Sequence, residues 1–220
     1  MLFTTLEVET VSRGKYLIHV YGTSHVSGDS MEVINEKLEE HDPDIVALEL
    51  DLGRLNALLN GKTSAQGGPI FLKLVKKFQD FIGSRTGVMP GEEMLYAYRK
   101  SIAENREVAL IDQDIRATIN RLETVSKKEK IRAMAEAGAA FLLPGRFDAS
   151  EIPEEEMIQK LLDEMEDRYP GLYRVFLEER NQVMSDYLRN LQEEEPDAEI
   201  VAFVGAAHRK DLEDRLKVEG

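Results

Sequence analysis

Three short segments of the chain are almost entirely apolar, and longer segments with a helical spacing of apolar residues separate them. They predict strands over 42–50, 108–111 and 199–204. A strand has a nearly continuous apolar sequence when helices cover both faces of a parallel sheet. The alternation therefore predicts an α/β fold with a central, mostly parallel sheet and helices on both faces.

The length of 220 residues suits a single domain over 1–220. Two β-like segments, 6–11 and 16–21, flank Gly14 and predict an N-terminal hairpin. A mainly helical elaboration, or cap, is expected around 61–106 and 116–192. The free edge of the hairpin would give a surface through which a homo-oligomer could form.

The charge of the chain excludes several classes of partner. With 42 acidic against 28 basic residues, the net charge is −14. Binding to nucleic acid or to an anionic membrane requires a basic surface, so neither is expected. Apolar runs reach only about eight residues, against roughly 20 for a bilayer span, so no membrane segment is expected in this chain. We expect a cytoplasmic or cytoplasmic-facing protein, which a longer parent chain could anchor to a membrane.

Polar residues follow each predicted strand, at the edge where parallel sheets bind ligands. Glu49 ends an apolar segment, where an unpaired acid is costly to bury. His25 and His208 each follow a glycine turn of the form Gly-x-x-His. We expect a substrate to lie against this edge, in contact with Gly22, Thr23, Ser24, Asp112 and Gly205.

Two histidines and a carboxylate allow two kinds of chemistry. They can hold a divalent metal that activates water, or one histidine can act as a general base that the glutamate orients. The spacing leaves both open. The other two histidines carry less signal: His19 is expected to face solvent or pack against a helix, and His41 to stabilise a helix C-terminus. The absence of cysteine excludes thiolate ligands and a cysteine nucleophile.

Six segments together resemble the TraB/PrgY pheromone-shutdown family, which is related to the Tiki proteases. They occur in the family's order across nearly the whole chain: 21–28 (YGTSHVSG), 43–51 (PDIVALELD), 90–94 (PGEEM), 110–115 (LIDQDI), 179–184 (ERNQVM) and 204–208 (VGAAH). The chain departs from the family pattern at Gln113, where relatives usually have arginine, and at the second alanine of the last segment.

The resemblance implies an α/β core with a helical elaboration and a metal-dependent peptidase activity, as in Tiki relatives. It places His25, Glu49 and His208 in the site as metal ligands. Arg180 and Asn181, which by spacing alone fit the solvated face of a long helix, become supporting polar groups. The wider superfamily includes haem-binding ChaN-like proteins, so haem is an alternative ligand.

The leading hypothesis is therefore a metal-dependent hydrolase that cleaves a peptide signal or a similar amide. His25, Glu49 and His208 would hold Mn²⁺, Co²⁺ or Zn²⁺, and Arg180 would stabilise the oxyanion, with Asn181 in support. One alternative is a protein that sequesters a peptide or haem without turnover. A second is a metal-independent esterase with His25 as its base.

Overall fold

The computed structural model describes residues 17–23, 29–61, 91–142 and 155–217. In these ranges the elements follow one another as β1 (Ile18–Thr23), α1 (Asp29–His41), β2 (Ile45–Leu48), α2 (Leu52–Leu59), α4 (Glu92–Ala103), β3 (Glu107–Leu110), α5 (Ile115–Thr124), α6 (Lys127–Leu142), α7 (Glu155–Arg168), α8 (Pro170–Tyr173), the π-helical turn η1 (Arg174–Glu178), α9 (Glu179–Glu194), β4 (Ile200–Gly205) and α10 (Ala206–Lys217).

The described strands form one sheet in the order β1-β4-β2-β3, and every pair in it is parallel. Ile18, Ile45 and Glu107 lie level at the amino end, the first two beside Ile200. This register confirms the expected α/β class with a central parallel sheet. The first segment of the expected hairpin lies outside the described residues.

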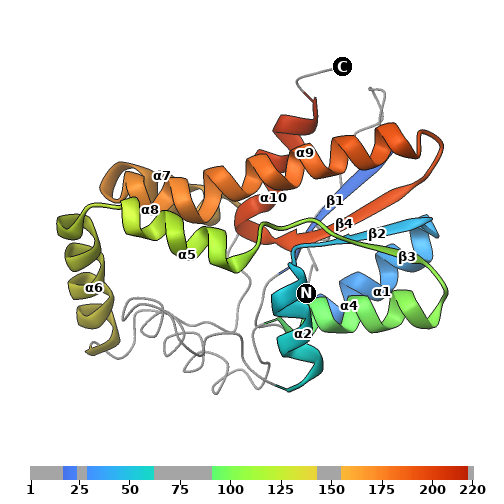
Figure 1. Cartoon of the computed structure of the whole chain (residues 1–220), viewed down its shortest axis with the longest axis horizontal. Coiled ribbons are helices and arrows are strands. Elements are labelled where there is room, and N and C mark those ends of the chain that lie inside the picture. The colour runs from blue at the N-terminus through green and yellow to red at the C-terminus, as the bar shows by residue number, and fades with distance from the viewer. Residues whose placement is uncertain (1–16, 24–28, 62–90, 143–154, 218–220) are drawn as a thin grey trace, which may run out of the picture.

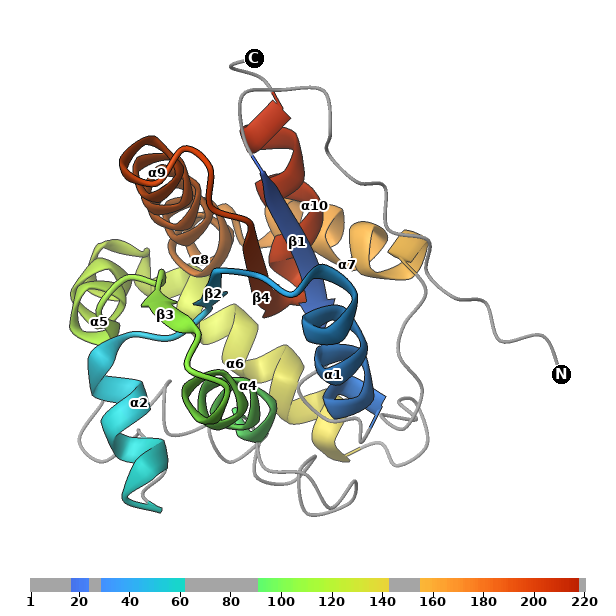
Figure 2. The same cartoon turned by 90° about the vertical axis from the view of Figure 1, so that its right-hand side faces the viewer.

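Helices cover both faces of the sheet (Figure 2). On one face Met184 and Leu188 of α9 and Leu212 of α10 pack against alternate strand residues. On the other face α1, α2 and α4 pack against the remaining strand side chains, among them the fully buried Phe203 of β4. Because both faces are covered, the strands are apolar on both sides, which explains their continuous apolar sequences.

Helices α5 to α8 lie beyond the carboxyl ends of the strands (Figure 1). Together with η1 they share a smaller core of buried residues, Leu122, Val125, Leu172 and Val175. Within the described ranges, no helix combines the length and the apolar character needed to cross a bilayer.

Local signals explain where several elements begin and end. Asp51 begins α2, since its carboxylate accepts the N–H groups of Gly53 and Arg54. Pro170 begins α8 at the first helical position, where a missing N–H costs nothing. Asp42 and Asn105 follow α1 and α4 with φ of 43° and 57°. These left-handed residues stop each helix and turn the chain into the next strand.

Candidate functional site

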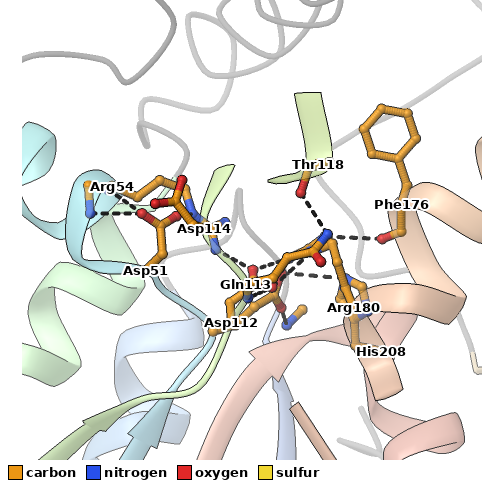
Figure 3. Close-up of polar contacts among 12 residues, drawn as sticks. Asp51, Arg54, Asp112, Gln113, Asp114, Thr118, Phe176, Arg180 and His208 are labelled. Atoms are coloured by element: carbon orange, nitrogen blue, oxygen red, sulfur yellow. Dashed lines mark hydrogen bonds and ion pairs between the residues drawn. The ribbon is translucent and has the colours of Figure 1, made fainter. Parts of the chain in front are cut away.

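The carboxyl ends of β2, β3 and β4 bring Glu49, Asp112 and His208 together with Arg180 of α9. Glu49 directly follows β2, Asp112 lies just after β3, and His208 is in the first turn of α10 after β4. Arg180, near the start of α9, extends between them, and Figure 3 shows it between Asp112 and His208. They meet because parallel strands end at one edge of the sheet.

Arg180 is the centre of this cluster. Its Nη2 donates to Glu49 Oε1 and, at 2.5 Å, to Asp112 Oδ2, while its Nε donates to Asp112 Oδ1 at 3.1 Å. Its Nη1 donates to His208 Nε2 at 3.0 Å. The side chains of Glu49 and Asp112 are 5% and 1% exposed. Burial alone would lower the pKa of Arg180, but the two carboxylates outweigh it and raise that pKa above its ordinary value. Arg180 is therefore a permanent, buried positive charge.

The hydrogen bonds of His208 define its tautomer. An arginine only donates, so Nε2 must accept from Arg180 and carry a lone pair. The other ring nitrogen, Nδ1, then carries the proton and donates to Asn181 Oδ1 at 2.5 Å. Asn181 Nδ2 in turn donates to Asp211 Oδ2 at 2.7 Å, which fixes the amide orientation. His208 is therefore a neutral imidazole, and its Nε2 lies 3.4 Å from Glu49 Oε1.

Glu49 connects two strands of the sheet. Its Oε2 accepts the N–H of Gly205 at 2.5 Å, at the point where β4 becomes α10. The acid is therefore paired on both oxygens, which explains how an apolar segment accommodates it.

Asp112 and Asp51 extend the cluster toward α2 through Arg54. Arg54 Nη2 donates to Asp112 Oδ2, and its Nε donates to Asp51 Oδ2 at 2.6 Å. The N–H of Gln113 donates to Asp112 Oδ1 at 2.8 Å. Arg54 was not among the predicted site residues. Its position three residues after a strand-end aspartate on a helix was the available signal.

The π-helical turn η1 lies directly before α9 and helps to aim Arg180. In it the N–H of Glu179 donates to the carbonyl of Arg174, five residues earlier. The carbonyl of Phe176 accepts Arg180 Nη1 at 3.2 Å, so the turn holds the guanidinium through the same nitrogen that contacts His208. Single π-turns of this kind are frequent at functional sites.

The other predicted residues lie either within the packed sheet or outside the described residues. Gly22 packs against α10, where a Cβ would lie 3.2 Å from Ala206 Cα. Thr23 is buried and its hydroxyl donates to the carbonyl of Val204 at 3.3 Å, within the sheet. Ser24 and His25 lie outside the described residues.

The predicted metal ligands were His25, Glu49 and His208, of which the last two are described. Their facing atoms, 3.4 Å apart, are spaced as two ligands of one ion would be. Both atoms, however, accept N–H groups from Arg180. With Arg180 in this position the guanidinium supplies the positive charge, so a metal would fit between these two atoms only if Arg180 moved away from both.

Comparisons with known proteins match most of the chain. The model of the TraB/PrgY/gumN family matches residues 8–217. An uncharacterized protein of Methanocaldococcus jannaschii is 29% identical and covers 91% of this chain. TraB domain-containing proteins of Bos taurus and Homo sapiens are 24% and 25% identical and cover 82% and 84% of it. The chain spans about half the length of these relatives, with 53% to 54% of each aligned.

Proposed function

The chain belongs to the TraB/PrgY/gumN family. From this membership and the geometry of the site, we propose that the protein hydrolyses a peptide or a similar amide or ester. The observation that carries the proposal is the contact of one buried guanidinium with a neutral imidazole and two carboxylates at the sheet's ligand-binding edge.

In the proposed mechanism, the substrate carbonyl oxygen takes the place of His208 Nε2 as the acceptor of Arg180 Nη1. The freed lone pair of His208 then removes a proton from a water molecule as the oxygen of that water attacks the carbonyl carbon. Arg180 stabilises the negative charge that develops on the carbonyl oxygen. Glu49 stabilises the imidazolium, which returns the proton to the leaving group as the bond breaks.

The supporting residues each have a distinct part. Asn181 holds the imidazole in the tautomer that presents Nε2. Asp112 binds Arg180 through two oxygens, so the guanidinium keeps its position when His208 releases it. None of these steps uses a metal.

A second version of the proposal is metal-dependent, because the spacing of Glu49 Oε1 and His208 Nε2 suits two ligands of one ion. Here Mn²⁺, Co²⁺ or Zn²⁺ would be held by His25, Glu49 and His208 and would activate water. This version requires Arg180 to withdraw from both atoms.

The test is turnover of a fluorogenic library of peptides and esters by the purified chain, with and without a chelator. We expect His208→Gln and Glu49→Gln to lower kcat/KM by about 10² to 10⁴-fold. Asp114→Asn is the control, since Asp114 also follows a strand of the sheet, β3, but caps α5 through the N–H of Arg116.

Each outcome separates the alternatives. Activity that survives the chelator supports the arginine-centred version, and activity that only an added metal restores supports the metal version. Stoichiometric loss of a peptide or haem without product identifies a sequestering protein and contradicts the hydrolase. Equal rates for Glu49→Gln and the original chain would contradict both versions.

A further inference from the structure

A second polar cluster lies at the opposite, amino end of the sheet. It brings together His19 of β1, His41 at the end of α1, and Glu199 directly before β4. From the level of Ile200 to that of Gly205 is five residues of parallel strand, or about 16 Å. The cluster is therefore separate from Arg180 and its partners.

Three side-chain atoms of this cluster lie within 4.8 Å of one another, close enough to contact one ion. Glu199 Oε1 lies 2.8 Å from His41 Nδ1 and 3.4 Å from His19 Nε2. Two ligands of a tetrahedral zinc ion are about 3.3 Å apart, given metal–ligand bonds of about 2.0 Å. The imidazole centroids are 4.0 Å apart and the ring planes are tilted by 33°, so β1 and α1 bring the two imidazoles side by side.

Of the two remaining ring nitrogens, that of His41 has an outer partner among the described residues and that of His19 has none. His41 Nε2 contacts the hydroxyl of buried Tyr21, the kind of outer partner that orients a metal-binding histidine. His19 Nδ1 is buried and has no hydrogen-bond partner among the described residues. The contact of its Nε2 with Glu199 is long for a hydrogen bond. His19 is therefore a buried imidazole whose polar atoms are poorly used by the protein alone.

The electrostatics of the cluster favour a neutral His19. Burial lowers the pKa of His19, and the nearby His41 lowers it further, against the opposing effect of Glu199. A neutral imidazole is the form that binds a metal. The side chains of His19 and His41 are 11% and 12% exposed, while that of Glu199 is 37% exposed and leaves an approach for an ion.

We propose that His19, His41 and Glu199 form a zinc-type metal site that joins β1, α1 and β4 at the amino end of the sheet. Two imidazoles and one carboxylate are a ligand set that suits Zn²⁺ and Co²⁺ better than Mg²⁺ or Ca²⁺. With three protein ligands, water completes the coordination on the exposed side of Glu199. Because its ligands come from three elements, the ion would stabilise the folded state.

The first test is calorimetric titration of Zn²⁺ into chelator-stripped chain. We expect one zinc ion to bind per chain. When the free zinc concentration is a hundred times Kd, we also expect the midpoint of thermal unfolding to rise by roughly 5–10 °C. His19→Gln and Glu199→Gln should each weaken binding at least tenfold. Circular dichroism in the presence of EDTA checks that both variants keep the fold.

The control variant is His208→Gln, which removes a histidine from the other end of the sheet. This variant should still bind one zinc ion per chain, even if it no longer hydrolyses a substrate. If instead His208→Gln abolishes zinc binding and the double variant His19→Gln/His41→Gln binds normally, the proposal is wrong and the ion belongs to the site at Glu49. Failure of the proposed hydrolase activity leaves this result unaffected.

A third measurement needs no substitution. The chain has four histidines, so long-range proton–nitrogen spectra resolve each imidazole. Zinc should shift the Nε2 signal of His19 and the Nδ1 signal of His41 at equimolar ion. If neither signal shifts, the proposal is overturned.

Discussion

The guanidinium of Arg180 balances two buried carboxylates, Glu49 and Asp112, so its removal takes a counter-charge from each of them and leaves Asp112 paired with Arg54. We expect Arg180→Met to lower the free energy of unfolding at pH 7 by about 3–5 kcal/mol, as when one member of a buried ion pair is deleted. Urea denaturation measures the change. Adding Asp112→Asn to the variant should restore part of the loss.

The matched control is Arg174→Met, six residues earlier, because Arg174 is 50% exposed and pairs with Glu179 only at 3.5 Å. Its effect should stay within about 1 kcal/mol. A similar loss in both variants would mean that the ion pairs of Arg180 do not account for the effect.

Gly22 permits a close approach between β1 and α10. A Cβ at this position would lie 3.2 Å from both Ala206 Cα and Arg209 Cδ. The arginine side chain can move, but the helix backbone is fixed by its own packing. We therefore expect Gly22→Ala to destabilise the protein by about 1–3 kcal/mol in thermal or urea unfolding. If Arg209→Ala fully rescues this variant, the side-chain contact rather than the backbone contact is responsible.

At the level of elements, Asp51 both begins α2 and holds Arg54 toward the site. Asp51→Ala removes the acceptor of two helix N–H groups and one ion pair. We expect a loss of about 2 kcal/mol in urea denaturation, at the upper end for a helix cap. Asp114→Ala removes a cap that accepts only the N–H of Arg116 among the described hydrogen bonds, and should cost about 0.5–1 kcal/mol. Equal losses would show that the Arg54 pair adds no stability.

The sequence predicts the elements well where local physics decides them. Apolar segments bounded by polar residues predict the three strands β2, β3 and β4, and Asp51, a capping residue type, predicts the start of α2. The order of the strands in the sheet, in contrast, is not set by local sequence. Placing β4 between β1 and β2 depends on packing between segments more than 150 residues apart, which no local pattern records.

The site was predictable only in part. The strand-end rule picks out Glu49, Asp112 and His208 because parallel strands end together. Arg180 lies on a charged helix, where periodicity alone suggests a solvated face, and only the family resemblance singled it out. The pairing of His19 with His41 and Glu199 requires three-dimensional contact, so neither histidine carried a local signal.

At the level of the whole molecule, the net charge of −14 opposes compaction. Salt screens repulsion between exposed carboxylates more than it weakens the buried ion pairs around Arg180. We therefore expect the thermal unfolding midpoint to rise by a few degrees as NaCl increases from about 20 to about 300 mM. Scanning calorimetry measures the shift. A falling midpoint would mean that exposed ion pairs outweigh the general repulsion.

The wide turn η1 has an evolutionary consequence. A turn closed over five residues holds one residue more than the α-helical turn that would replace it. Losing that residue would leave a continuous helix but rotate Arg180 by about 100° relative to the helices before it, because an α-helix has 3.6 residues per turn. A relative with a one-residue deletion between 174 and 178 would thus keep the arginine but direct its side chain away from the site. Two relatives could therefore align at this arginine although it has a different role in each.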